Sequence, residues 1–292
     1  IYHLDGRPVD PGLLARMTDT MAHRGPDAAG RWIDGSVGLG HRMLYATPES
    51  VREQQPLVDE TGNLCLVLDG RVDNREELRA ALVAKGTNPR TDTDAELVLC
   101  AYQCWGEDCP AKIIGDFAFV IWDARKRQLF CARDPLGMKS LYYHSDGRTF
   151  VCASEMQPLF EEPTLRRAPN LFLIGMYLSE NYDEREETLY EGVYRLPPAH
   201  SLVVKDGSVR KARYWDVDPD HAIRYRTDAE YAEHFLALFR EAVRCRLRSH
   251  GPVGSCLSGG LDSSSIVCVA QALYDEQPGL GKALETFSVV FD

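Results

Sequence analysis

The heptapeptide Ser258-Gly-Gly-Leu-Asp-Ser-Ser264 sets the architecture of the last part of this 292-residue chain. It follows a short apolar run, Val253 to Leu257, and precedes a helical pattern from about Ser263 to Leu273. In such a place glycines let the backbone approach an anion, and the N–H groups at the start of the helix point at it. The pattern predicts a loop that cradles phosphate. The alternative is an ordinary glycine-rich turn.

Asp262 adds a second expectation, because a carboxylate beside a phosphate requires a divalent cation. We therefore expect Mg²⁺, with Asp262 as its ligand. No GxxxxGK[ST] sequence is present, which excludes a P-loop NTPase. The loop resembles the SGGxDS pyrophosphate loop of the ATP pyrophosphatase superfamily, whose members cleave ATP between its α and β phosphates to make adenylates.

That resemblance implies an ATP site on the strand, the loop, the helix and the final apolar run. Its residues are Leu257, Ser258, Gly259, Gly260, Leu261, Asp262, Ser263, Ser264 and Val289.

A linker and a helix precede the loop. Leu196 to Pro219 contains Pro-Pro and Asp-Gly and predicts a hairpin and a linker. Thr227, followed three residues later by Glu230, is a capping box that begins a helix to about Arg248. We expect one domain over residues 1–219 and the start of an α/β domain over 220–292. We also expect that second domain to be incomplete in this chain.

The first two thirds of the chain predicts a strand-rich α+β domain. Short apolar runs such as Leu64 to Leu68 and Phe117 to Trp122 alternate with turn signals. Two helical patterns interrupt them, from Asp10 to about His23 and from Ala95 to Trp105.

Composition excludes several classes of protein. With 33 Lys and Arg against 44 Asp and Glu, the net charge of −11 opposes binding to nucleic acid. No run approaches the roughly 20 apolar residues of a membrane span. Nine cysteines without CxxC pairs predict reduced thiols in a cytoplasmic protein. Cys100 and Cys104 lie four apart in an apolar helical pattern, which favours core packing over a metal site.

Six segments of the first two thirds follow one another in the order and spacing of the asparagine synthetase family. They are His23-Arg-Gly-Pro-Asp27, Leu39-Gly-His-Arg-Met-Leu44, Asp69-Gly-Arg-Val-Asp-Asn-Arg-Glu-Glu-Leu78, Thr91-Asp-Thr-Asp-Ala-Glu96, Gly115-Asp-Phe-Ala-Phe119 and Arg133-Asp-Pro-Leu-Gly137. The resemblance implies an N-terminal-nucleophile glutaminase sandwich, of two antiparallel sheets between helices, followed by an ATP pyrophosphatase domain. In that family an N-terminal Cys attacks the glutamine amide, and the released ammonia meets an aspartyl adenylate.

The same resemblance implies a glutamine pocket. Arg42 pairs with the glutamine carboxylate, a bidentate task suited to guanidinium, and Asp94 and the Gly70 backbone hold the amino end. Two alternatives stay open, namely a salt bridge for Arg42 and a helix cap for Asp94.

Three departures from the family predict that the glutaminase half is weak or inactive. No residue of this chain matches the N-terminal Cys, so no catalytic residue is identified. The family's Asn-Gly oxyanion hole reads Asp69-Gly70, and an ionised carboxylate accepts hydrogen bonds where an oxyanion needs a donor. The usual Glu-Ile-Tyr that follows reads Arg71-Val-Asp73.

An inactive glutaminase beside an adenylating loop favours a ligase whose substrate brings its own amine. The run Tyr45-Ala-Thr-Pro-Glu-Ser50, with Glu53 and Gln55, resembles the lasso peptide cyclase branch. That branch joins the N-terminal amine of a precursor peptide to an Asp or Glu side chain, with leader-binding or protease proteins as partners. The alternatives are a glutamine-hydrolysing asparagine synthetase, with aspartate and glutamine as substrates, and a non-catalytic nucleotide-binding scaffold.

Overall fold

The structure is a computed structural model, and it describes residues 1–181, 186–277 and 284–290. The chain forms two compact units. Unit 1 comprises Ile1–Leu44 and Arg52–Asp216, and unit 2 comprises Tyr45–Val51 and Val217–Asp292. The short segment Tyr45–Val51 thus belongs with residues that follow it far along the chain.

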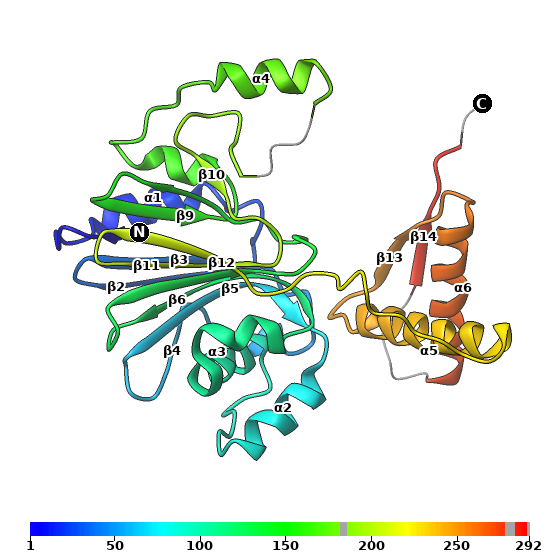
Figure 1. Cartoon of the computed structure of the whole chain (residues 1–292). Helices are drawn as coiled ribbons and strands as arrows, with labels where there is room; N and C mark the ends of the chain where they lie inside the picture. Colours follow the sequence, from blue (N-terminus) through cyan, green and yellow to red (C-terminus); the bar gives the residue numbers. More distant parts are fainter. Residues whose placement is uncertain (182–185, 278–283, 291–292) are drawn as a thin grey trace. The chain divides into compact units, whose positions relative to one another are not determined.

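Unit 1 contains two six-stranded sheets whose strand pairs are antiparallel (Figure 1). The first sheet runs β10 (Tyr194–Arg195), β8 (Tyr142–Ser145), β9 (Thr149–Ala153), β1 (Tyr2–His3), β3 (Val37–Met43), β2 (Ala28–Asp34). The second runs β12 (Ser208–Arg213), β11 (His200–Lys205), β7 (Gln128–Arg133), β6 (Gly115–Asp123), β5 (Leu64–Val72), β4 (Leu57–Val58).

Three cores make unit 1 a four-layer sandwich. One apolar cluster fills the space between the sheets, and includes Val37, Leu39 and Cys131. A second lies between the second sheet and the helices α2 (Arg75–Ala84) and α3 (Asp94–Trp105). A third packs α1 (Pro11–Asp19) on the first sheet. These layers confirm the expected sandwich of two antiparallel sheets between helices. The helix α4 (Leu171–Leu178) completes the unit.

Helix α3 begins where the sequence predicts it, with a different cap. Thr93 is the N-cap, and its side chain accepts a hydrogen bond from the Glu96 backbone N–H at 3.4 Å. Asp94 is the first helical residue. Cys100 and Cys109 are buried in the core under this helix, as the apolar spacing of Cys100 predicts.

Unit 2 is a strand–helix–strand element preceded by a long helix. The helix α5 (Asp228–Leu247) opens with the predicted capping box of Thr227 and Glu230. The strands β13 (Val253–Cys256) and β14 (Leu284–Phe287) pair in parallel, and α6 (Leu261–Glu276) connects them. Residues 286–291 have the apolar pattern of a strand, but β14 ends at Phe287, and residue 291 lies outside the described ranges. In the described ranges, none of the helices combines the length and apolarity that a bilayer span requires.

Candidate functional site

The loop between β13 and α6 has the geometry of an anion cradle. Gly259 has a φ of +79°, a conformation that glycine adopts without strain, and Gly260 is the N-cap of α6. The Oγ atoms of Ser258 and Ser263 lie 3.0 Å apart. The helical ladder begins with the Ser264 N–H donating to the Gly260 carbonyl at 3.1 Å, so the N–H groups before it face outward, unpaired within the helix. The loop therefore presents hydroxyls, N–H groups and the positive end of a 16-residue helix together.

The structure brings the final run of the chain to the same loop. The Leu257 N–H donates to the Phe287 carbonyl at 2.8 Å, and the Ser288 hydroxyl donates to the Leu257 carbonyl at 2.7 Å. Val289, which follows Ser288, is 81% exposed. An apolar surface of this kind beside an anion cradle fits a base attached to a phosphate chain.

Asp262 lies in the first turn of α6, next to the cradle, and is exposed. In the described part of the chain, no three His, Cys, Asp or Glu side chains come together as a metal-binding group. Mg²⁺ is usually held by one or two carboxylates together with substrate phosphates and water. A single carboxylate beside the cradle therefore fits an ion that arrives with a nucleotide.

Asp69 is the second feature of the site, and strand alternation sets where it points. In β5, Cys65 and Val67 face the core between the sheets, and Asp69 continues that face. Its Oδ1 accepts a hydrogen bond from Lys139 Nζ at 2.6 Å, and its Oδ2 accepts one from the Arg24 guanidinium at 3.0 Å. Arg24 also donates to Glu155 Oε1 at 3.3 Å. We call these four residues the Asp69 cluster.

The charges of the Asp69 cluster balance. Burial raises the pKa of Asp69, but Lys139 and Arg24 more than offset this effect, so the pKa lies below its ordinary value. Asp69 is thus a carboxylate at neutral pH, and both of its oxygens accept hydrogen bonds from cations. It cannot donate to a developing oxyanion, as the amide of an asparagine could.

The loop that carries Lys139 is rigid. The carboxylate of Asp134 accepts hydrogen bonds from the backbone N–H groups of Leu136, Met138 and Lys139 at 2.9 to 3.1 Å. Arg133 donates to the carbonyl of Lys139 at 2.5 Å. The backbone of Lys139 is therefore held in place, and its side chain reaches Asp69 from this backbone.

Asp94 is held by Arg75 of α2, whose guanidinium donates to its carboxylate. The Asp94 side chain is only 5% exposed. Gly70 lies in β5 opposite Phe117 of β6, and a Cβ atom there would lie 2.5 Å from the Asp116 carbonyl oxygen. Only glycine fits this close approach of two strands.

Arg42 lies apart from the other three predicted pocket residues. In β3, Val37 and Leu39 face the core between the sheets, whereas Arg42 has the opposite parity. Its guanidinium donates to Asp19 Oδ1 at 2.5 Å and to the Thr18 carbonyl at 3.3 Å, both on α1. Met43, 93% buried, takes the inward position instead. The structure thus gives Arg42 the salt bridge that was its alternative.

Several residues of the site were not singled out for a role in the sequence. His41 donates from Nε2 to the Leu68 carbonyl at 3.0 Å, and Gln55 bonds both the N–H and the carbonyl of Leu68. Glu53 accepts hydrogen bonds from Gln55 at 2.6 Å and from the Ala95 N–H at 3.1 Å. Burial raises the pKa of Glu53. The alternation of β3 predicts the inward place of His41, but no local signal predicts the partners of Glu53.

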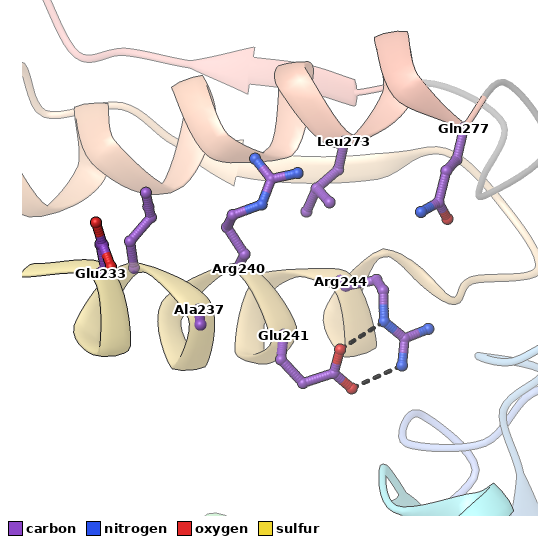
Figure 2. Close-up of a pocket in the computed structure, with 8 residues that line it drawn as sticks. Glu233, Ala237, Arg240, Glu241, Arg244, Leu273 and Gln277 are labelled. Carbon is purple, nitrogen blue, oxygen red and sulfur yellow. Dashed lines mark hydrogen bonds and ion pairs between the residues drawn. The ribbon is translucent and has the colours of Figure 1, made fainter. Parts of the chain in front are cut away.

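A groove of about 440 Å³ lies between α5 and α6 (Figure 2). Its arginines are engaged by carboxylates of the same helices. Arg240 donates to Glu276 at 2.5 Å, and Arg244 donates to Glu241 through two bonds of 2.6 and 2.7 Å. The groove is therefore of mixed charge, unlike the loop at the start of α6.

Comparisons with known proteins agree with this two-part layout. A family model described as a glutamine amidotransferase domain matches residues 3–215, and one described as asparagine synthase matches residues 234–292. Asparagine synthetase [glutamine-hydrolyzing] 3 of Bacillus subtilis is 31% identical over 284 residues, which cover 96% of this chain and 45% of that protein. Amidase chry2 of Gibberella zeae is 32% identical, over 96% of this chain and 43% of its own.

Two further comparisons concern one solved structure, which shares the fold, and one more relative. The glutamine phosphoribosylpyrophosphate amidotransferase from B. subtilis aligns with a TM-score of 0.53 at 15% identity, over 96% of this chain and 64% of its own. Putative asparagine synthetase 2 of Methanocaldococcus jannaschii is 31% identical, over 98% of this chain and 58% of its own. This chain spans about half the length of the curated relatives it matches. With a glutamine amidotransferase domain followed by a segment that matches asparagine synthase, the chain belongs to the asparagine synthetase family.

Proposed function

We propose that this chain is part of an ATP-dependent amide-forming ligase. A substrate carboxylate oxygen attacks the α phosphorus of ATP, the bond to the β phosphate breaks, and pyrophosphate leaves. An amine then attacks the acyl carbon of the adenylate and AMP leaves. The cradle of Ser258, Gly259, Gly260 and Ser263 supports this proposal, because its donors suit the pyrophosphate. Mg²⁺, held with the help of Asp262, would neutralise phosphate charge.

We further infer that the glutaminase-like unit does not supply ammonia. The observation that supports this inference is the Asp69 cluster. There Lys139 donates a hydrogen bond to Asp69 Oδ1 at 2.6 Å, and Arg24 donates one to Asp69 Oδ2 at 3.0 Å. Loss of one oxyanion donor typically costs about 2.7 to 4 kcal/mol of transition-state stabilisation, and a negative charge adds repulsion. Arg42 points to α1, so it is not available there for a glutamine carboxylate.

An amine supplied by the substrate itself then completes the reaction. In the lasso peptide cyclase form of this proposal, a precursor peptide carries both the activated Asp or Glu side chain and the attacking N-terminal amine. Closing the ring within one molecule gains the advantage of proximity. Leader-binding and protease proteins are the expected partners.

A second candidate is a glutamine-hydrolysing asparagine synthetase, and the relatives favour it by name. Several of them are named glutamine-hydrolysing asparagine synthetases, from Bacillus subtilis and Methanocaldococcus jannaschii. This candidate requires that Asp69 be tolerated in the glutamine pocket.

One assay separates these candidates. The complete gene product receives ATP, Mg²⁺, aspartate and glutamine, and glutamate, asparagine and pyrophosphate are measured. The cyclase proposal expects no glutamate, and pyrophosphate only with a cognate precursor peptide. Robust glutamate and asparagine would establish the synthetase instead. ATP binding without pyrophosphate release under any condition would leave a nucleotide-binding scaffold.

The metal assignment has its own test. Asp262→Ala is expected to abolish pyrophosphate release, because no carboxylate then remains in the first turn of α6. Asp275→Ala, near the other end of the same helix, is the matched control and retains activity. A fully active Asp262→Ala protein would refute the assignment of Mg²⁺ to this side chain.

A further inference from the structure

We propose that Glu49 positions the pyrophosphate loop through Arg248, an inference that rests on the proposed ATP-dependent function. The two residues lie 199 positions apart in the chain. Both belong to unit 2, because Tyr45–Val51 packs with Val217–Asp292. The Arg248 guanidinium donates to Glu49 Oε2 at 2.6 Å, and the two side chains are only 19% and 16% exposed.

The segment that carries Glu49 is itself well ordered by hydrogen bonds. The Ser50 hydroxyl donates to the Thr47 carbonyl at 2.7 Å and accepts from the Thr47 N–H at 3.1 Å. Thr47 and Ser50 are both buried. Because this turn closes on itself, Glu49 is presented from a fixed backbone rather than from a loose loop.

Arg248, the partner of Glu49, lies in the connection between α5 and β13. It is the C-cap of α5, and β13 begins five residues later at Val253. The residues next to it are held by the same segment. The His250 N–H donates to the Ala46 carbonyl at 3.0 Å, and the Ser249 hydroxyl donates to the same carbonyl at 3.4 Å.

The strand β13, which follows this connection, is short, so we expect its position to depend on the contact between Glu49 and Arg248. β13 has four residues, none of them buried, and it leads directly into Leu257 and the phosphate cradle. Removing the Glu49 carboxylate weakens the attachment of the connection between α5 and β13, so the start of β13 shifts and the cradle N–H groups no longer converge on one point. A preorganised anion site loses affinity when its donors are disordered, because they must be ordered again on binding. The pair of Glu49 and Arg248 therefore controls ATP affinity rather than the chemistry of the acyl group.

The test measures the Kd for ATP with Mg²⁺ by calorimetry on the complete gene product, below the melting temperature of every variant. Glu49→Gln is expected to raise this Kd about tenfold, and to raise the KM for ATP with little change in kcat. The charge swap of Glu49→Arg with Arg248→Glu is expected to recover most of the lost affinity. The matched control is Asp92→Asn, which removes an exposed ion pair with Arg52 and leaves the Kd unchanged.

An unchanged Kd in Glu49→Gln would overturn the proposal, and so would a charge swap that stays as weak as the single variant. A wild-type protein that binds no ATP would instead overturn the proposed function. The two failures are therefore distinguishable.

Discussion

The Nζ atom of Lys139 lies 2.6 Å from Oδ1 of Asp69, although 70 residues separate the two in the chain. The pair lies beside Gly70, at the position where the resemblance to the asparagine synthetase family predicts an oxyanion hole. The Asp69 side chain faces a cation on each side, Lys139 and Arg24. The structure thus shows an internal ion-pair cluster where an amide would present a donor.

The Asp69 cluster is expected to contribute modestly to stability. Its side chains are 26 to 35% exposed, so Lys139→Met should lower the free energy of unfolding by about 1 kcal/mol. Asp69→Asn should have a similar effect. The double variant should cost clearly less than the sum of the two single variants, because each of them already removes the same ion pair between Lys139 and Asp69. Urea unfolding measures all three, and strict additivity would contradict direct coupling.

The ion pair of Asp94 and Arg75 is expected to matter more. Asp94 is 5% exposed, so removing the guanidinium takes an opposite charge away from a buried carboxylate. Arg75→Met should therefore cost about 3 kcal/mol or more. Arg52→Met, which removes the exposed pair with Asp92, should cost less than about 1 kcal/mol. Equal losses in the two variants would show that burial does not govern these pairs.

His41 is expected to make stability depend on pH near neutrality. Burial lowers the pKa of His41 below its ordinary value of 6.5, although Leu68 and Asp69 oppose that shift. A group whose folded pKa is lowered contributes stability above the unfolded pKa, and this contribution is lost as the pH falls through the folded pKa. His41→Gln keeps a donor for Leu68 but does not titrate.

The measurement is the free energy of unfolding of both proteins between pH 7.5 and about pH 5, above the range in which most carboxylates titrate. The wild type should lose more stability than His41→Gln as the pH falls. His3, whose pKa is also lowered by burial, is present in both proteins and cancels in the difference. Parallel pH curves would assign the dependence to other groups.

Gly70 is expected to tolerate no side chain. In Gly70→Ala the new Cβ atom would lie 2.5 Å from the Asp116 carbonyl oxygen and 2.8 Å from Phe117 Cα, both backbone atoms of β6. The strands must separate, at a cost of about 2 kcal/mol or more. Gly175→Ala is the matched control, since its Cβ meets nothing within 4 Å in α4 and alanine favours a helix. The midpoint of urea unfolding should fall in the first variant and not in the second.

Local signals predicted several elements of this fold but not the helices α2 and α4, which lie outside the two helical patterns expected in unit 1. The capping box of Thr227 and Glu230 begins α5 as its pattern indicates, because both partners lie within one turn. The glycine-rich loop lies between a strand and a helix, as the spacing of apolar residues on either side of it predicts. The apolar residues of α5 are not buried along its whole length. Phe235 and Leu238 are 68% and 59% exposed, whereas Val243 and Leu247 are the buried residues.

The pocket residues show where local reasoning stops. Arg42 matched a motif, yet the alternation of β3 turns its side chain to Asp19 and leaves Met43 inward. That alternation was available in the sequence, because Val37 and Leu39 are apolar and share the parity of Met43. The partners of Asp69, in contrast, come from segments 45 and 70 residues away, and no local period connects them.

The sequence by itself determined the family, the glycine-rich loop between a strand and a helix, and the carboxylate at position 69, because each depends on residue identity and on spacing within a few turns. Only the tertiary structure decided that Lys139 and Arg24 neutralise that carboxylate, that Arg75 holds Asp94, and that Glu49 reaches Arg248. These contacts depend on how strands from distant segments stack and which way each side chain alternates. The packing of the whole unit determines these contacts, so the sequence of one segment alone does not predict them.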